Sequence, residues 1–393
     1  MNVITGNCEN GRLVLKAAGR IDSANAAQTE SEIEALRASF PHEEAVLDAE
    51  ELAYISSAGL RVILRLRKNE PSLKIVNVSG DVYDILEMTG FTEMLPVSKA
   101  YRRISVDGCE VIGQGANGKV YRLDPDTIIK VYLNPDSLPD IHRERELARR
   151  AFVLGIPTAI PYDVVRVGEG YGSVFELLNA KSFAKLVRET PEDLDKYTGL
   201  SVELLKKIHS TEVKPDDMPD MRQVALGWAK FVADYLPADK GEKLLSLVRE
   251  VPVVHKMMHG DYHFKNVMMQ NGEVLLIDMD TLCQGHPIFE LASVFNAYVG
   301  FCLLDHSVAD SFLGFSFETA CAIWEKTLRL YFPEASKETL ALIEDKAKLI
   351  GFTRIMRRQI RRHALDTEKG RKEIDFYREN IIELLGRVDS LLF

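Results

Sequence analysis

Residues 259–266 of the 393-residue chain, HGDYHFKN, place several side chains capable of chemistry within eight positions. Asp261 offers a carboxylate that can orient and deprotonate a hydroxyl group. Asn266 and, twelve residues later, Asp278 offer oxygen atoms, which are the ligands that Mg²⁺ prefers. A carboxylate beside a magnesium site is the arrangement that phosphoryl transfer from a nucleotide requires. The same stretch could be an ordinary polar loop, so the elements around it decide between the two interpretations.

The two histidines of this stretch raise a zinc alternative. His259 and His263 are four residues apart, which is the spacing at which two histidines on a helix bind zinc. Gly260 and the turn-like sequence GDYH disfavour a helix there, and the sequence offers no third ligand nearby. The pattern therefore favours an oxygen-ligand site over a zinc site.

A glycine-rich segment precedes this stretch along the chain. In residues 111–132, VIGQGANGKVYRLDPDTIIKVY, the glycines Gly113, Gly115 and Gly118 lie between segments that alternate like strands. In a dinucleotide-binding fold such glycines open a helix, whereas here a strand pattern containing Val120 follows them. The glycines therefore cap a β-hairpin, which either covers the phosphates of a nucleotide or is an ordinary glycine-rich turn.

Lys130 lies within the apolar strand pattern IIKVY, where its ammonium group needs a phosphate or carboxylate partner. The segment after residue 138 has the pattern of a helix, and Glu144 lies on the same side of it as the apolar residues. Glu144 can therefore face inward and pair with Lys130. The alternative is that Glu144 pairs only with a neighbouring arginine.

Length and composition indicate a folded protein with more than one domain. Apolar residues make up 46% of the chain and charged residues 27%, which is the balance of a globular protein. The net charge of −10 and the lack of a basic tail argue against a nucleic-acid partner. The one basic run, RIMRRQIRR at 354–362, is expected to be a solvated helix face or a patch that pairs with acids.

No stretch approaches the roughly 18 apolar residues of a membrane span, and the N-terminus lacks the pattern of a signal peptide. We therefore expect a cytoplasmic protein without a membrane partner. Five scattered cysteines form no C-x-x-C pair, so we expect them to be buried free thiols.

The character of the sequence changes near residue 100. Residues 1–100 alternate strand and helix patterns, which predicts a small α/β sandwich. Residues 101–178 have strand patterns with one helix, and residues 179–393 carry mostly helical apolar stripes. We expect three units with these boundaries, of which the last two form one bilobal domain.

The stretch VLDAEELAYISSAGLRVIL, residues 46–64, resembles the signature of the STAS domain, the fold of anti-sigma-factor antagonists. In that family a partner kinase phosphorylates a serine at a helix N-terminus, so the resemblance implies Ser57 as a candidate phosphorylation site. Ser56 stands where the family usually has an aspartate. Helix-initial amides would stabilise a phosphate there, whereas the alternative is that Ser56 or Ser57 only caps the helix. The resemblance also implies a regulatory or recruiting role, with an anti-sigma-factor-like or other STAS-linked signalling partner.

The motifs HGDYHFKN, LIDMD and GHPIFELA resemble, in this order, those of the aminoglycoside phosphotransferase and choline kinase superfamily, which has the protein-kinase fold but phosphorylates small molecules. Gly260, where protein kinases usually carry arginine, and His263, where they usually carry lysine, favour this branch. The resemblance implies a small β-rich lobe and a large helical lobe, with Asp261 as the catalytic base and Asn266 and Asp278 as Mg²⁺ ligands. It further implies that Lys130 and Glu144 belong with Asp261 to the catalytic residues. The ATP-binding residues that it implies, in the small lobe and at the junction of the lobes, are Gly113, Gly115, Gly118, Val120, Lys130, Glu176 and Leu178.

The implied activity is ATP- and Mg²⁺-dependent transfer of the γ-phosphate to a hydroxyl of a small molecule, such as an aminoglycoside or amino alcohol. The resemblance places the acceptor pocket among the C-terminal helices, where acidic residues such as Asp305, Asp310 or Glu318 would bind a cationic acceptor. One alternative is a protein serine kinase that acts on Ser57 in cis or on another STAS protein. Another is an inactive nucleotide-binding scaffold, which the complete set of polar motif residues disfavours.

Overall fold

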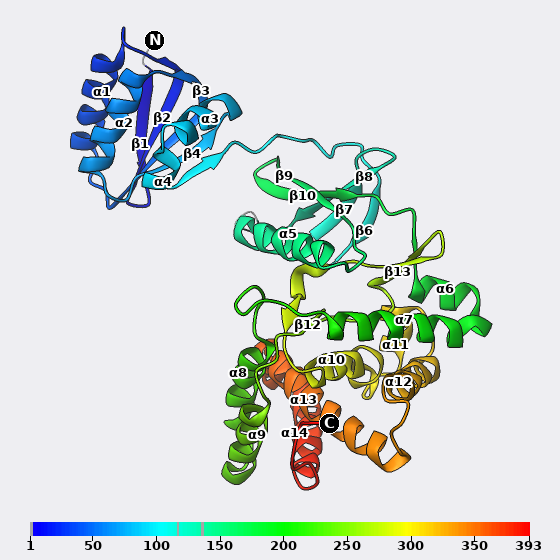
Figure 1. Ribbon diagram of the computed structural model, residues 1–393. Helices are drawn as coiled ribbons and strands as arrows, with labels where there is room; N and C mark the ends of the chain where they lie inside the picture. The colour runs from blue at the N-terminus through cyan, green and yellow to red at the C-terminus, as the bar shows by residue number, and fades with distance from the viewer. Residues whose placement is uncertain (1–2, 116–117, 135–136) are drawn as a thin grey trace. The chain divides into compact units, whose positions relative to one another are not determined.

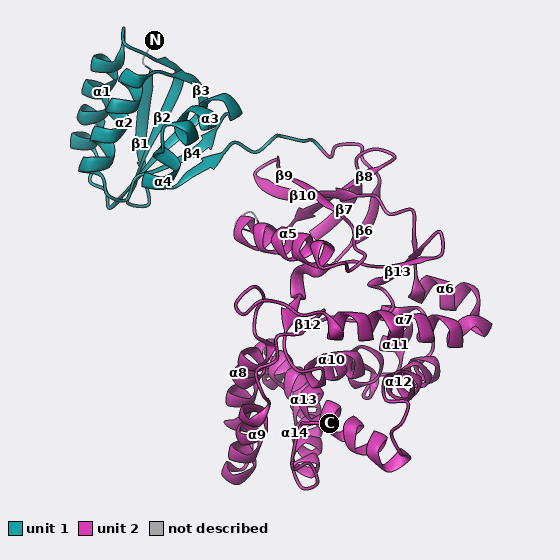
Figure 2. Cartoon of the chain, viewed as in Figure 1, with its two compact units in different colours: residues 1–105 teal, residues 106–393 magenta. Residues whose placement is uncertain are grey.

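The computed structural model describes residues 3–115, 118–134 and 137–393. The chain forms two compact units, residues 1–105 and residues 106–393 (Figure 2). Within the described residues, no helix combines the length and the apolar character needed to cross a membrane.

The first unit is a five-stranded sheet with four helices (Figure 1). The strands, in their order across the sheet, are β1 (Ile4–Glu9), β2 (Arg12–Ile21), β3 (Glu44–Ile55), β4 (Lys74–Val78) and β5 (Val97–Lys99). The helices are α1 (Ala26–Ser39), α2 (Ser57–Asn69), α3 (Gly80–Met88) and α4 (Phe91–Met94). β1 runs antiparallel to β2, and the other neighbouring strands are parallel. This α/β fold agrees with the expectation for the N-terminal region.

One face of this sheet carries the core of the first unit. In the first half of β3, Ala45, Leu47 and Ala49 are buried, whereas Val46 and Asp48 between them are partly exposed. The buried apolar side chains of the helices pack in one cluster with the buried side chains of the sheet. The alternation is that of a sheet whose one face is covered and whose other face meets solvent.

The turn from β3 into α2 contains the serine pair considered above. Ser56 is the N-cap, and its hydroxyl accepts hydrogen bonds from the N–H groups of Ala58 (3.2 Å) and Gly59 (3.5 Å). Ser57 is the first residue of the helix and is exposed. A Cβ on Gly59 would lie 2.7 Å from a side-chain carbon of Ile55, so glycine allows the helix to approach the sheet closely. Ser56 is therefore the capping residue of the serine pair, a position at which serine and aspartate are about equally favourable.

We predict that Ser56→Ala lowers the stability of the first unit by about 1 kcal/mol, because two helix-initial N–H groups lose their acceptor. Ser57→Ala is the matched control, since its exposed side chain makes no cap, and it should change stability by less than about 0.5 kcal/mol. Hydrogen exchange of the α2 amides in the full chain measures both effects. Equal protection in the two variants would contradict the assignment of Ser56 as the cap.

The second unit begins with a small antiparallel sheet (Figure 1). Across the sheet the strands follow the order β6 (Val111–Gln114), β7 (Gly118–Arg122), β8 (Thr127–Tyr132), β10 (Gly170–Glu176) and β9 (Pro161–Val167). Helix α5 (Leu138–Val153) packs against β9 and β10. β6 and β7 form the glycine-rich hairpin expected from the sequence.

The rest of the second unit is mostly helical. Its helices are α6 (Phe183–Glu189), α7 (Leu194–Ser210), α8 (Met221–Ala233), α9 (Ala238–Glu250), α10 (Ile288–Tyr298), α11 (Ser307–Leu313), α12 (Phe317–Tyr331), α13 (Lys337–Arg361) and α14 (Glu368–Leu384). Its short strands are β11 (Lys181–Ser182), β12 (Met257–Met258), β13 (Val267–Gln270), β14 (Glu273–Leu276) and β15 (Cys283–Gln284). A small β-rich lobe followed by a large helical lobe is the predicted kinase-like architecture.

The cysteines are all free thiols, as expected. Cys283 and Cys302 are buried, but Cys8, Cys109 and Cys321 are only partly buried. The expectation that all five are buried is therefore wrong for three of them.

Candidate active site

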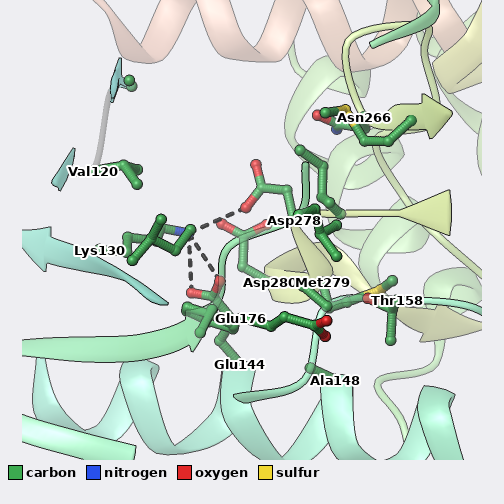
Figure 3. Close-up of a pocket in the computed structure, with 18 of the residues that line it drawn as sticks. Val120, Lys130, Glu144, Ala148, Thr158, Glu176, Asn266, Asp278, Met279 and Asp280 are labelled. Atoms are coloured by element: carbon green, nitrogen blue, oxygen red, sulfur yellow. Dashed lines mark hydrogen bonds and ion pairs between the residues drawn. The ribbon is translucent and has the colours of Figure 1, made fainter. Parts of the chain in front are cut away.

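A cavity of about 450 Å³ lies in the second unit (Figure 3). Its volume is in the range of small-molecule binding sites. The residues proposed from the sequence to bind nucleotide or metal all line it, namely Gly113, Gly115, Gly118, Val120, Lys130, Glu144, Glu176, Leu178, Asn266 and Asp278. Asp261 is outside this lining, and Ser57 belongs to the other unit.

Two glycines of the β6–β7 hairpin, Gly118 and Gly115, differ in whether the surrounding protein atoms exclude a larger side chain. A Cβ on Gly118 would lie 2.4 Å from the carbonyl oxygen of Val131, so the pairing of β7 with β8 itself requires glycine there. A Cβ on Gly115 would meet no described protein atom within 4 Å. Protein packing therefore leaves Gly115 unexplained, whereas the close approach of a ligand to the backbone would explain it.

Lys130 forms the central ion pair of the cavity, drawn with dashed lines in Figure 3. Its ammonium group donates to both carboxylate oxygens of Glu144, at 2.9 and 3.1 Å, and to Asp278 at 3.1 Å. Glu144 is buried and also accepts a hydrogen bond from the hydroxyl of Tyr132. Burial opposes the charge of Lys130, but the carboxylates of Glu144 and Asp278 raise its pKa above the ordinary value. Lys130 is therefore a fixed cation that faces the cavity.

Negative charge exceeds positive charge around this lysine. Glu144, Asp278 and Asp280 surround the single ammonium group. Burial and the neighbouring Asp278 raise the pKa of Asp280, which indicates that its carboxylate lacks sufficient positive charge nearby. Asp278 also has a left-handed backbone (φ 65°), a strained conformation often found at functional sites. Asp280 was missed in the sequence, where its only signal was its place two residues after Asp278.

We predict that Lys130→Met weakens nucleotide binding by about 10- to 100-fold, the usual effect of losing a hydrogen bond to a charged partner. The same change should destabilise the second unit, because it leaves the buried Glu144 carboxylate without its cation. The double variant Lys130→Met/Glu144→Leu separates the two effects, since it removes the buried charge as well. It should recover stability in chemical denaturation but not nucleotide affinity in calorimetry. Recovery of both would show that Lys130 acts only on the fold.

The walls of the cavity away from these charges are apolar. They are formed by side chains from both lobes, namely Ile112, Val120, Ile128, Phe175, Met268 and Ile277. The backbone N–H of Glu176 donates a hydrogen bond to the carbonyl oxygen of Ile160 (3.2 Å), and that of Leu177 donates one to the carbonyl oxygen of Asp126 (2.7 Å). In the described part of the chain, Leu178 is therefore the residue of this segment whose N–H can serve a ligand. Of these apolar residues, only Val120 was identified from the sequence, because single apolar strand residues carry no signal of what they line.

The carboxylate of Asp261 lies beside His263, whose Nε2 is 3.5 Å away. Burial favours the neutral acid, but His263 and the positive charge of Arg354 together lower the pKa of Asp261 to about 2. Asp261 is therefore ionised at neutral pH. The side-chain amide of Asn266 donates to the backbone carbonyl of Asp261 at 3.0 Å, which joins the two motif residues.

Buried polar groups fix the loop around Asp261. His259 uses both ring nitrogens, because Nε2 lies 3.0 Å from the carbonyl oxygen of Ile277 and Nδ1 accepts the N–H of Asp261 at 3.3 Å. His259 therefore has no nitrogen left for zinc. The buried carboxylate of Glu290 accepts the backbone N–H groups of His259 and Gly260. Burial opposes ionisation of Glu290, but His209, His259 and the Gly260 N–H lower its pKa.

Arg354 on α13 also contacts this loop. Its guanidinium donates to the carbonyl oxygen of Gly260 (3.3 Å) and to the hydroxyl of Ser293 (2.9 Å). It also lies over the ring of Trp228, 5.4 Å from the ring centroid. The expectation that the whole basic run is a solvated or acid-paired face is therefore wrong for Arg354. The contact joins residues 94 positions apart, so no local pattern could reveal it.

A β-rich lobe, a helical lobe and a cavity lined by residues of both form the architecture of the kinase-like class. The sequence matches the phosphotransferase enzyme family, APH, over residues 108–311, and the STAS domain over residues 3–104. The chain belongs to the APH family and carries an N-terminal STAS domain.

Each of the two parts of the chain is similar to a known protein. The N-terminal region is 36% identical over 95 residues to BtrV of Bordetella bronchiseptica, a protein named as an anti-sigma factor antagonist. That match covers 23% of this chain and 81% of BtrV. The kinase-like part is similar to a thermostable mutant of aminoglycoside phosphotransferase APH(4)-Ia, solved in a ternary complex with ADP and hygromycin B. This match has 12% identity and a TM-score of 0.50, and it covers 71% of this chain and 93% of the other, so it establishes the fold alone.

Proposed function

We propose that the protein transfers the γ-phosphate of ATP to a hydroxyl group of a small molecule. The observation that carries this proposal is the position of Asp261, whose backbone carbonyl accepts a hydrogen bond from Asn266 (3.0 Å), a residue that lines the cavity together with Lys130 and Asp278. ADP is bound to the similar APH(4)-Ia structure, which supports a nucleotide as the occupant of the cavity. Because cells hold their ATP in the cytoplasm, we propose that the protein acts there.

The residues of the cavity fit a nucleotide and a magnesium ion. Apolar side chains can enclose an adenine ring, Leu178 offers a peptide N–H to its edge, and Lys130 can bind a phosphate. The excess of negative charge around Lys130 fits a divalent cation. The described residues form no cluster of three His, Cys, Asp or Glu side chains that could hold a metal by themselves. Mg²⁺ needs only one or two protein ligands because it keeps its waters and binds phosphates. Asp278 and the amide oxygen of Asn266 would hold the ion, which would neutralise charge on the phosphates.

The proposed step needs few groups from the protein. Asp261 orients the acceptor hydroxyl, whose oxygen forms a bond to the γ-phosphorus while the bond from that phosphorus to the bridging oxygen of ADP breaks. The hydroxyl proton passes to Asp261. A carboxylate with a pKa of about 2 is a weak base, so it accepts this proton late, as fits a loose transition state. Lys130 and the peptide groups of the hairpin hold the phosphates in line.

We propose that the STAS domain regulates this activity or recruits a signalling partner. The similarity to an anti-sigma factor antagonist supports a partner of the anti-sigma-factor type. Ser57 is exposed at the start of α2, so a kinase can reach its hydroxyl.

Incubation of the full chain with ATP labelled at the γ-phosphate, with Mg²⁺ and with a panel of hydroxyl compounds tests the proposal. Label on an added small molecule supports it. Label on the protein that disappears in Ser57→Ala would instead support a protein kinase acting on the STAS serine. Nucleotide binding without any transfer would support the inactive scaffold.

A further inference from the structure

A row of arginines at the C-terminal end of α13 includes a residue that contacts the loop with Asp261. Arg354 and Arg358 are four residues apart on the helix, so they project from the same side of it, and Arg362 is the C-cap residue that follows. Arg354 contacts the loop that carries Asp261, through the carbonyl oxygen of Gly260. Arg358 lies over the ring of Phe301, 4.9 Å from its centroid, and is near enough to Asp261 for their charges to interact. None of these arginines belongs to the segment 108–311 that matches the family.

These arginines lack acidic partners. Across residues 3–115, 118–134 and 137–393, no carboxylate forms a salt bridge within 4.0 Å with Arg354, Arg358 or Arg362. Burial of part of the Arg358 side chain lowers its pKa, and the charges of Arg362 and Arg354 act in the same direction, so like charges repel within the row. Arg358 and Arg362 are exposed, in agreement with the expected solvated face, and the alternative of acid pairing is wrong for this row. A bound anion would offset the repulsion, and the planar guanidinium group is suited to carboxylates and phosphates.

The helix dipole explains only part of this arrangement. Basic residues are favourable in the last turn of a helix, where Arg358 and Arg361 lie. The dipole does not account for Arg354, which lies earlier in the helix. It also does not select the side of the helix, whereas Arg354 contacts Gly260 next to Asp261 and Arg358 follows one turn later on the same side.

The acidic side chains expected to bind a cationic acceptor lie on or beside α11 and α12, and α11 contacts the loop at 259–266, where the rings of Phe312 and His263 have centroids 5.1 Å apart. Asp305, Asp310 and Glu318 are exposed, and the Asp305 carboxylate accepts the N–H and hydroxyl of Ser307. In the described part of the chain, no hydrogen bond or ion pair joins Asp305, Asp310 or Glu318 to this loop. The loop adds a further cation instead, since the ammonium group of Lys265 lies 4.7 Å from the ring centroid of Phe312.

We infer that the phosphate acceptor is an anion, a hydroxyl compound that carries a carboxylate or a phosphate group. Arg358 binds this group while the hydroxyl faces Asp261, and Arg354 holds the loop that carries Asp261. The inference rests on the proposed function, because it assigns the acceptor of the same reaction. It departs from the hygromycin B seen with APH(4)-Ia, since aminoglycosides are cations.

A panel of four acceptor classes tests the inference: hydroxy acids, polyol phosphates, neutral polyols and hydroxylated amines, each assayed by ATP turnover. We expect turnover with one of the two anionic classes, and the separate arms identify carboxylate or phosphate as the recognised group. Arg358→Gln should raise the KM for that acceptor by about 10- to 100-fold and leave the KM for ATP unchanged. Arg329→Gln is the matched control, because it removes an exposed arginine from α12 and should leave both KM values unchanged. Turnover with hydroxylated amines alone, or an unchanged acceptor KM in Arg358→Gln, would overturn the inference.

A binding measurement keeps the inference testable if no compound is phosphorylated. The wild-type chain, saturated with ADP and Mg²⁺ so that the nucleotide site is filled, is titrated with inorganic phosphate and with a dicarboxylate. Thermal stabilisation of the wild type and of Arg329→Gln, but not of Arg358→Gln, would retain the anion site even though the proposed transfer had failed. Equal stabilisation of all three would refute the anion site while leaving the phosphotransferase proposal untouched.

Discussion

Asp261→Asn is expected to lower the rate of phosphoryl transfer by about 10²- to 10⁴-fold, the usual contribution of a positioned acid–base group. Asparagine keeps the size of the side chain but cannot accept the hydroxyl proton. Nucleotide affinity should stay the same, because Asp261 does not line the nucleotide cavity. The effect is measured as kcat in the labelled-ATP assay, with the ADP dissociation constant determined in parallel.

Asp366→Asn provides the control for this change. Asp366 is an exposed carboxylate of the same unit, near His363, and its replacement should leave kcat unchanged. If Asp261→Asn retains the wild-type rate with the acceptor that the panel identifies, Asp261 is not the base. If it loses nucleotide binding as well, the variant acts through the fold and not through the proton.

Gly260→Ala is expected to destabilise the second unit by about 2–5 kcal/mol, because two costs add. Gly260 has a left-handed backbone (φ +84°), which an alanine adopts only at a cost of about 1–2 kcal/mol. A Cβ there would also lie 2.4 Å from the carbonyl oxygen of Thr281, so the loop has to move. Because Asp261 is the next residue, we expect kcat to fall by about 10²-fold, the effect of misplacing a catalytic group by about 1 Å.

Gly272→Ala separates these two costs. Gly272 has nearly the same backbone conformation (φ +86°), but a Cβ there meets no described atom within 4 Å. It should therefore show the backbone cost alone and keep its activity. Tryptophan fluorescence during urea unfolding is a suitable measurement, because both tryptophans, Trp228 and Trp324, lie in the second unit. Equal midpoints and equal kcat values for the two variants would show that the contact with Thr281 is unimportant.

The sequence was most informative where burying a side chain of that type without a partner would be unfavourable. A lysine in an apolar strand demands a partner, and Glu144 was the inward-facing carboxylate of the following helix, so the ion pair with Lys130 could be anticipated. The glycine-rich hairpin could also be predicted, because a strand pattern follows Gly118.

The sequence was least informative where a role depends on contacts between distant segments. Arg354 looks like any basic residue on an amphipathic helix until the fold brings it to Gly260. The excess of charge that raises the pKa of Asp280 depends on its burial and on Asp278, and neither can be read from LIDMD. The serine pair at 56–57 was ambiguous for a different reason, because either residue could cap a helix until the backbone geometry of the turn was known.

The contact between Arg354 and Gly260 has a consequence for the order in which the protein matures on the ribosome. The chain emerges from its N-terminus, so the loop with Asp261 is synthesised 94 residues before the arginine that holds it. Helix α13 also supplies buried side chains to the core against α10, the helix that carries Glu290. A nascent chain therefore contains the complete motif before it has a working active site, and the loop becomes fixed only after Arg354 has been synthesised and α13 has folded.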